Sequence, residues 1–257
     1  MSLAVSVLGS TSSCSGSRVT PDHVLTLDLD WAPDWMIDGV AAPLIERRVK
    51  ATWFVTHSSP AVDRLRERRE LFRLGMHPNC LPGSTQGGSE REVLAHARTL
   101  VPEAVCMRTH ALYQSTPFLL MAARDFGVRI DVSLALPHTP NLQPHQFDYR
   151  GCSLHRIPYF WEDDLEMFRS SPVWSVQHPD LLVPGLKIFD FHPVFLCLNC
   201  SDYEVYQRLK RDRPVHNWTL DTCGHAFRKG AGPMSLFLEL VDGLAAIGGG
   251  RWIEELV

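Results

Sequence analysis

Short apolar segments with strand character alternate with longer segments of helical spacing along most of this chain. The strand-like segments are VLTLD (24–28), ATWFV (51–55), VCM (105–107), VRIDVSLAL (128–136) and LKIFDFHPVFL (186–196). Segments with helical apolar spacing occupy 33–48, 60–75, 89–101, 115–127 and 233–250. This order predicts an α/β fold in which helices wrap parallel strands, as a barrel or a doubly wound sheet. In both architectures, functional residues gather at the carboxyl ends of the strands.

Composition narrows the class of protein. The 257 residues are 45% hydrophobic and 21% charged, which suits one domain over 1–257, with residues 1–20 as a strand and polar lead-in and a core from about 22 to 250. The net charge of −4 argues against nucleic-acid binding, and no apolar run is long enough to span a membrane. The start lacks the basic region of a signal peptide, and the seven cysteines show no disulfide framework. We therefore expect reduced thiols and a cytoplasmic protein.

Polar residues follow several of the predicted strands at the point where each strand ends. They are Asp28 and Asp30, His57, His77, Arg108 and His110, and His192. Asp28 and Asp30 point the same way on an extended strand, so they repel each other unless a cation lies between them or the chain turns there. Carboxylates and imidazoles at one edge of a sheet form a ligand set for a divalent transition metal, with zinc the default. One aspartate would then bind the metal, and the other would take a proton from a water molecule.

Five segments resemble the polysaccharide deacetylases of the nodulation-protein (NodB) homology type. They are TLDLDWAP (26–33), ATWFVTH (51–57), GMHPN (75–79), MRTHALYQS (107–115) and FDFHP (189–193), in the order of that family's motifs. The residues in these segments are most similar to those of a subgroup encoded among lipopolysaccharide O-antigen genes. The resemblance implies a distorted (β/α) barrel of about seven strands. It also implies a metal-dependent hydrolase that acts on an N-acetyl or related amide of a sugar.

The resemblance also implies roles for individual residues. Asp28 falls on the family's base, Arg108 on the residue that holds this base, and His192 on the general acid or oxyanion partner. His77 falls on the first metal histidine.

Two positions depart from the family pattern. The metal aspartate normally adjoins the base, where this chain has Leu29, so Asp30 is the candidate. The second metal histidine is replaced by Leu81, which leaves His110 or Asn79 as the substitute.

Two further segments offer binding chemistry. PYFWEDD (158–164) places aromatic rings beside acids, which suits sugar binding through Tyr159, Trp161, Glu162 and Asp163, with Asn79 as a further contact. The alternative is a packed loop that covers the barrel. Cys197, Cys200, Cys223 and His225 have a spacing that a structural zinc site would need, although buried cysteines also behave as small apolar residues.

We therefore expect a metal-dependent hydrolase that removes an acyl group, most simply acetyl, from an amide-linked sugar during O-antigen biosynthesis. Its partner would be a carbohydrate, without nucleic acid or a membrane span. Two alternatives remain at this stage, a saccharide-binding barrel without catalysis and an amidohydrolase of a small non-sugar amide. The sugar, the acyl group and the oligomeric state do not follow from the sequence.

Overall fold

The computed structural model describes residues 18–257, so the strand expected near the amino terminus lies outside the described residues. The strands are β1 His23–Asp28, β2 Ala51–Val55, β3 Phe72–Met76, β4 Cys106–Met107, β5 Ile130–Asp131, β6 His145–Tyr149, β7 Cys152–Arg156, β8 Trp161–Glu162 and β9 Lys187–Phe191. The helices are α1 Asp34–Arg47, α2 Pro60–Glu67, α3 Glu90–Leu100, α4 Thr116–Phe126, α5 Asp163–Met167, α6 Pro193–Leu198, α7 Tyr203–Asp212, α8 Leu220–Cys223 and α9 Pro233–Ala246. No helix among residues 18–257 combines the length and the apolar character that crossing a bilayer requires.

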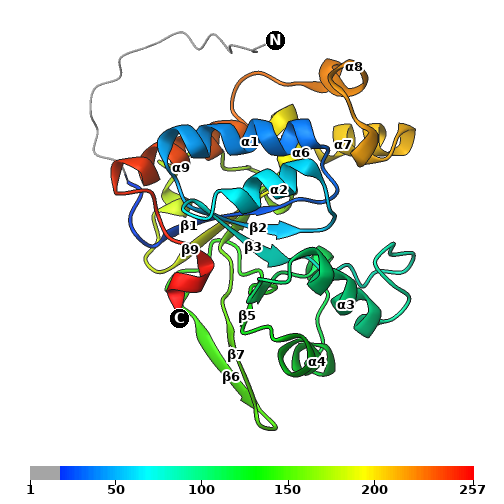
Figure 1. The fold of residues 1–257 in the computed structure, drawn as a ribbon. Coiled ribbons are helices and arrows are strands. Elements are labelled where there is room, and N and C mark those ends of the chain that lie inside the picture. Colours follow the sequence, from blue (N-terminus) through cyan, green and yellow to red (C-terminus); the bar gives the residue numbers. More distant parts are fainter. Residues whose placement is uncertain (1–17) are drawn as a thin grey trace.

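One curled sheet organises the chain. Its strand order is β6-β7-β5-β4-β3-β2-β1-β9-β8, and every pair is parallel except the β6–β7 hairpin. The hairpin projects from the body of the molecule (Figure 1). The expected α/β class with a curled, barrel-like sheet is confirmed, with nine strands in the described part instead of about seven. The hairpin adds one strand, and the chain from 152 to 162 is divided into β7 and β8.

The segment between β7 and β8 links the two sides of the curled sheet. Tyr159 N donates to Leu134 O and Phe160 N donates to Ile188 O, at 2.9 Å each. The first bond joins this segment to the chain after β5, and the second joins it to β9. Backbone hydrogen bonds thus satisfy polar groups on both sides of a segment whose side chains are buried. The carboxyl ends of the parallel strands therefore face a common region.

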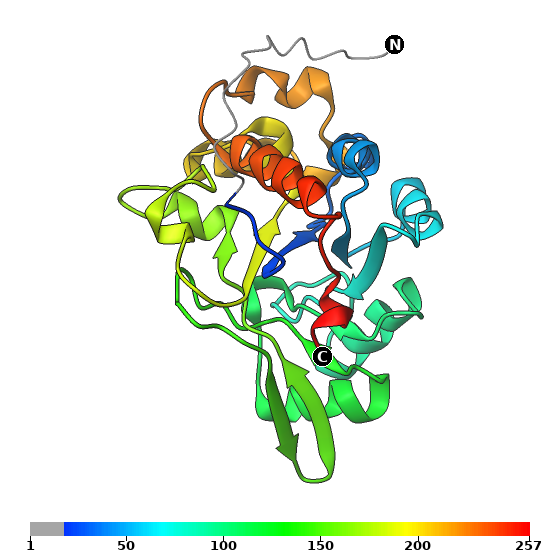
Figure 2. The ribbon, with the colours of Figure 1, turned by 90° about the vertical axis from the view of Figure 1, so that its left-hand side faces the viewer.

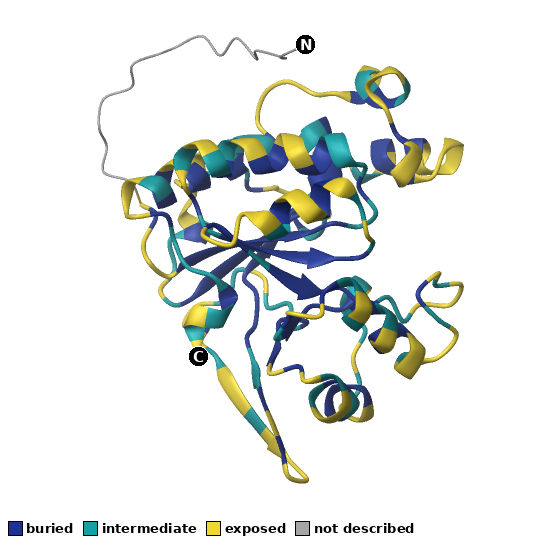
Figure 3. Cartoon of the chain, viewed as in Figure 1, coloured by how far each residue is buried: buried dark blue, intermediate teal, exposed yellow. Residues whose placement is uncertain are grey.

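Helices cover the outside of the sheet. Helices α1, α2, α6 and α9 lie together over one part, and α3 and α4 lie beside the other, as two views of the ribbon show (Figures 1 and 2). The central strands are buried along their whole length, whereas β6 is mostly exposed (Figure 3). This burial explains why the central strands read as nearly continuous apolar runs, as expected when both faces of a parallel sheet are covered.

Two boundaries predicted from the sequence are wrong. The helix predicted over 60–75 ends at Glu67, and its second half is strand β3, which contains Gly75. The strand predicted over 186–196 ends at Phe191, because Pro193 starts α6. A short apolar segment such as LFRLGM fits the apolar spacing of a helix or of a strand. Its pairing with β2 decides that it forms a strand.

Gly75 lies where β2 and β3 meet with no room for a side chain. A Cβ there would lie 2.6 Å from two ring carbons of Phe54 and 3.0 Å from Cys106 Sγ. At Gly39 in α1, by contrast, the nearest atom to such a Cβ is Cys197 Sγ at 3.9 Å. The two glycines therefore form a matched pair.

We expect Gly75→Ala to lower the free energy of unfolding by about 1–3 kcal/mol, because the methyl group must displace the ring of Phe54. Gly39→Ala should leave it unchanged or raise it by up to about 1 kcal/mol, because alanine favours the helix. Urea unfolding followed by circular dichroism measures both. Equal effects of the two substitutions would contradict the packing described for β2 and β3.

Candidate active site

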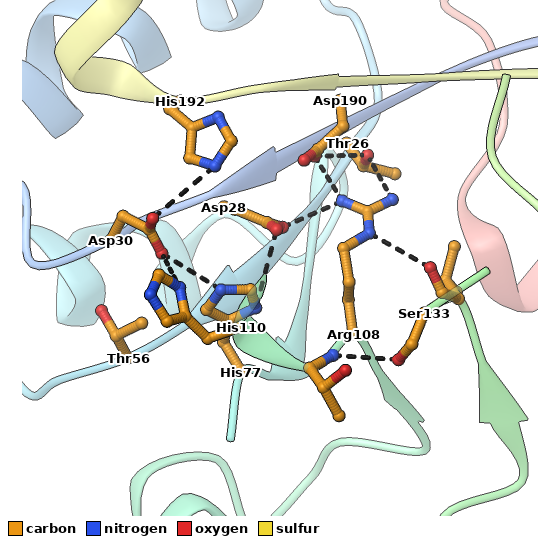
Figure 4. Close-up of polar contacts among 12 residues, drawn as sticks. Thr26, Asp28, Asp30, Thr56, His77, Arg108, His110, Ser133, Asp190 and His192 are labelled. Carbon is orange, nitrogen blue, oxygen red and sulfur yellow. Dashed lines mark hydrogen bonds and ion pairs between the residues drawn. The ribbon is translucent and has the colours of Figure 1, made fainter. Parts of the chain in front are cut away.

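The residues predicted from the strand ends meet at one edge of the sheet. Asp28 ends β1, His77 follows β3, Arg108 follows β4 and His192 follows β9. Figure 4 shows these side chains converging with Asp30 and His110. Asp28, Asp30, His77, His110 and His192 line a cavity of about 290 Å³. His57 lies outside this lining.

A left-handed turn places Asp30. Leu29 still pairs with β2, donating its N–H to Phe54 O at 3.0 Å, and its side chain is buried. Asp30 and Trp31 then take φ values of 43° and 58°, and Trp31 N donates to Thr56 Oγ1 at 3.0 Å. Such angles are costly for residues other than glycine, and they often occur at functional sites. The turn brings the Asp30 carboxylate to the cavity although Asp30 does not adjoin Asp28.

Asp30 is the centre of a possible metal-ligand group. Its Oδ1 lies 3.1 Å from His77 Nε2 and 3.0 Å from His110 Nδ1. One ligand atom from each of the three residues lies within 4.8 Å of the others. Ligands at about 2.0–2.2 Å from one ion are separated by roughly 3–3.5 Å, so these three atoms fit a small divalent cation. Among residues 18–257, the structure thus provides a two-histidine, one-carboxylate set.

Of the two substitutes for the missing histidine, His110 is the one that the structure brings to this set. His110 N donates to Pro78 O at 3.0 Å, and the His110 ring meets the His77 ring edge-on at 5.5 Å. The Asn79 side chain instead accepts from Leu81 N at 3.0 Å and does not line the cavity. Contact with substrate stays a prediction for Asn79. Its side chain closes a local turn.

Charges in this group support one another. Burial alone would raise the pKa of Asp30, but His110 and His77 hold it well below its usual range. Burial alone would lower the pKa of His77, but Asp28 and Asp30 raise it. The two carboxylates thus favour the protonated form of the His77 imidazole. A divalent cation would supply the same positive charge, which agrees with the donor set.

Arg108 is a fully buried cation between two carboxylates. Its Nη1 donates to Asp28 Oδ1 at 2.9 Å and also to Asp190, while Nη2 donates to Thr26 Oγ1 at 2.9 Å. Burial opposes the charged guanidinium, but Asp190 and Asp28 raise its pKa above the usual value. Asp28 Oδ2 remains for other contacts and lies 3.6 Å from His77 Nδ1.

Asp190 is a member of this cluster that the sequence analysis missed. It is fully buried, and burial raises its pKa to about 8, although Arg108 acts in the opposite direction. The signal was present, because an acid stands in the otherwise apolar strand KIFDF. The register of the sheet explains why Asp190 lies in this cluster, because Asp190 on β9 pairs with Thr26 on β1.

Tyr159 and Trp161 are fully buried among other residues of the protein, so the prediction that they contact sugar is wrong. The Arg108 guanidinium lies between the rings of Phe54 and Tyr159, 4.6 and 4.7 Å from their centroids. The Trp161 ring has no exposed surface and packs against Phe191 at 4.9 Å. The alternative of a packed segment holds for these two rings.

Asp163 orients His192 and does not face the cavity, which corrects its prediction as a substrate contact. Its Oδ2 accepts from His192 N at 2.8 Å, and its Oδ1 lies 2.7 Å from His192 Nδ1. Burial raises the pKa of Asp163 to about 6, and the carboxylate in turn raises the pKa of His192 well above its usual value despite burial. His192 Nε2 is left to face Asp30 Oδ2 at 3.7 Å.

Glu162 does line the cavity, together with residues that the sequence analysis did not select. Glu162 Oε2 accepts from Tyr159 Oη at 2.5 Å. Asp164 also lines the cavity, and its buried Oδ1 has no hydrogen-bond partner. Tyr203, Tyr206 and Lys210 of α7 form another part of the wall. No local motif marks α7, because its packing depends on the distant chain around it.

The cysteines do not form the second metal site considered above. Cys197, Cys200 and Cys223 are free, and their thiols donate to the carbonyl groups of Met36, Asp202 and Thr219. Within the described part of the chain, no possible metal-ligand group contains these cysteines or His225. The small-apolar-residue interpretation accounts for them.

A protein-family model described as WbmS-like polysaccharide deacetylase matches residues 25–210 of this chain. The chain belongs to that family. The matched range contains Asp28, Asp30, His77, Arg108 and His192. The resemblance found from the sequence motifs is thereby confirmed, and the site described above is a site in a member of the WbmS-like family.

Solved structures agree with this membership. One is a Bordetella bronchiseptica protein, WbmS, described as a candidate polysaccharide deacetylase involved in O-antigen biosynthesis. It is 29% identical, with a TM-score of 0.70 over 88% of this chain and 90% of that one. The 4-α-glucanotransferase of Thermococcus litoralis is 10% identical, with a TM-score of 0.51 over 91% of this chain and 37% of that one, and shows likeness of fold alone. No curated protein matches this WbmS-like chain.

We expect Arg108→Met to lower the free energy of unfolding by about 3–5 kcal/mol, because Asp28 and Asp190 would stay buried without their cation. The control is Arg64→Met, which removes an exposed arginine paired with Asp38 and should leave the free energy of unfolding nearly unchanged. Urea unfolding measures both values. Similar losses for the two variants would show that the buried cluster does not depend on its charge.

Proposed function

We propose that this protein is a metal-dependent hydrolase that removes an acyl group, most simply acetyl, from an amide nitrogen on a sugar of a surface polysaccharide. Family membership and the similarity to a Bordetella protein linked with O-antigen biosynthesis support this class of substrate. The single observation that carries the proposal is the convergence of Asp30, His77 and His110 beside Asp28 and His192. Free thiols agree with a reducing compartment, and we propose the cytoplasm.

Asp30, His77 and His110 would hold the divalent ion, for which zinc is the simplest choice. When bound there, such an ion lowers the pKa of water and polarises a carbonyl oxygen. The protein contributes the fixed geometry of the three ligand atoms. The left-handed turn at Asp30 and the hydrogen bond from His110 N to Pro78 O both restrict that geometry.

Asp28 is the proposed general base. Arg108 engages its Oδ1, which leaves Oδ2 to take a proton from the attacking water molecule. The hydrogen bond from the buried guanidinium fixes the orientation of this carboxylate. The water oxygen then adds to the amide carbon.

His192 is the proposed general acid. Asp163 holds its Nδ1, which directs Nε2 toward the cavity, and the carboxylate favours the protonated imidazolium. As the carbon–nitrogen bond breaks, Nε2 gives its proton to the leaving nitrogen. The carboxylic acid that forms gives its remaining proton to the released amine, so the products are a carboxylate and an ammonium sugar, and the proton held by Asp28 passes to His192 for the next cycle.

We expect the metal-free protein to bind one zinc ion per chain, and His77→Ala or His110→Ala to weaken binding by at least about 100-fold, because each removes one of three ligands. Isothermal titration calorimetry and metal analysis measure this. His178→Ala is the matched control, since His178 is exposed on a loop away from the cavity. Unchanged zinc affinity in both cavity variants would contradict the proposed ligand set.

We expect the zinc-loaded protein to release acetate from N-acetylated saccharides, and Asp28→Asn to lower kcat by about 10²–10⁴-fold while zinc content stays the same, because the base is lost. Asp148→Asn on the exposed β6–β7 hairpin is the control. An enzyme-coupled acetate assay measures both. Saccharide binding without acetate release would favour the binding barrel, and release only from small non-sugar amides would favour that other substrate class.

A further inference from the structure

A second, smaller cavity adjoins the one that contains the candidate active site. It measures about 180 Å³, and Trp31, Pro214, Val215 and His216 line it in addition to residues of the inner cavity. The two cavities share Asp30, His110, Tyr206 and Lys210. They therefore form one continuous cleft with two compartments, and Lys210 lies where the compartments meet.

Charge differs between the two ends of this cleft. The inner compartment has Glu162 and Asp164 on its wall, from the end of β8 and the start of α5. The outer compartment has Lys210 and His216, and its one carboxylate is that of Asp30, which is engaged by His77 and His110. Among residues 18–257, no carboxylate lies within ion-pairing distance of Lys210 Nζ, which sits 5.4 Å from the centroid of the Tyr206 ring. The outer compartment thus offers an exposed cation that no carboxylate of the described residues pairs with.

The other walls of the outer compartment are apolar. Trp31 is partly exposed, and its ring stands edge-on to His110 at 5.3 Å. The same hydrogen bond to Thr56 that fixes the Asp30 turn also fixes the Trp31 backbone. Tyr206, Pro214 and Val215 complete the apolar part. Aromatic and aliphatic walls with a cation at one side suit an apolar sugar face that bears a negative group.

We propose that the outer compartment is an anion-selective subsite, in which Lys210 binds a carboxylate or phosphate group attached to the sugar that is processed. This proposal rests on the proposed function for the identity of the ligand as a saccharide. Lys210 attracts such a group toward the outer compartment, so its charge also favours one orientation of the sugar in the cleft. Lys210 is then a specificity-determining residue.

The test measures binding, so that it does not depend on turnover. Zinc-loaded protein is titrated by calorimetry with three probes: N-acetylglucosamine, N-acetylglucosamine 1-phosphate and the uronic acid of N-acetylglucosamine. We expect at least one anionic probe to bind about 5–20-fold more tightly than the neutral sugar. The 1-phosphate identifies a substrate carried on a phosphate, and the uronic acid identifies a ring carboxylate.

The variants separate Lys210 from other positive charge in the cleft. Lys210→Gln should reduce the preference for the anionic probe by about 5-fold, and Lys210→Arg should retain most of it. Lys229→Gln, at an exposed lysine that does not line the cleft, should leave the preference unchanged. Equal affinity of the wild-type protein for neutral and anionic probes, or an unchanged preference in Lys210→Gln, would overturn the subsite. Absence of acetate release alongside a Lys210-dependent preference would overturn the proposed function and not the subsite.

Discussion

The buried guanidinium of Arg108 is the interaction on which this site depends. It connects β4 to β1 and β9 through Asp28, Asp190 and Thr26, and two aromatic rings enclose it. Burying two acids side by side is costly without such a cation, and even beside Arg108 burial raises the pKa of Asp190 to about 8. The same contact that stabilises the sheet edge therefore also holds the Asp28 carboxylate in place beside the cavity.

Two aspartates at the end of β1 have different surroundings and so different chemistry. Asp28 lies on the strand and pairs with a permanent cation. Asp30 lies on a strained turn and faces imidazoles, whose charge depends on protons or on a metal ion. The repulsion expected between neighbouring carboxylates is relieved because Asp28 pairs with Arg108, Asp30 faces His110, and His77 lies beside both carboxylates. This division suits the roles proposed for them, ion binding for Asp30 and proton transfer for Asp28.

Asp163 looks like part of a sugar-binding surface in the sequence, but in the structure it orients His192. Asp163 follows aromatic residues in a segment that looks suited to sugars, yet both of its oxygens contact His192. Tyr159 likewise packs on Arg108. The residues of this segment that do line the cavity are Glu162 and Asp164. Aromatic residues beside acids are thus an ambiguous sequence signal. The same residues can bind sugar when exposed or pack inside the protein when buried, and the sequence does not give their burial.

The sequence by itself determined the α/β class, the family and the polar residues at the ends of β1, β3, β4 and β9, because alternating apolar periods are local and parallel strands bring their carboxyl ends together. It could not determine that 72–76 is a strand, since the same apolar spacing fits a helix until β2 pairs with it. Only the tertiary structure chose His110 over Asn79, placed Asp190 against Arg108, buried Trp161 and brought Lys210 to the cleft. Each of these outcomes depends on contacts between residues far apart in the chain, whose distances no local pattern contains.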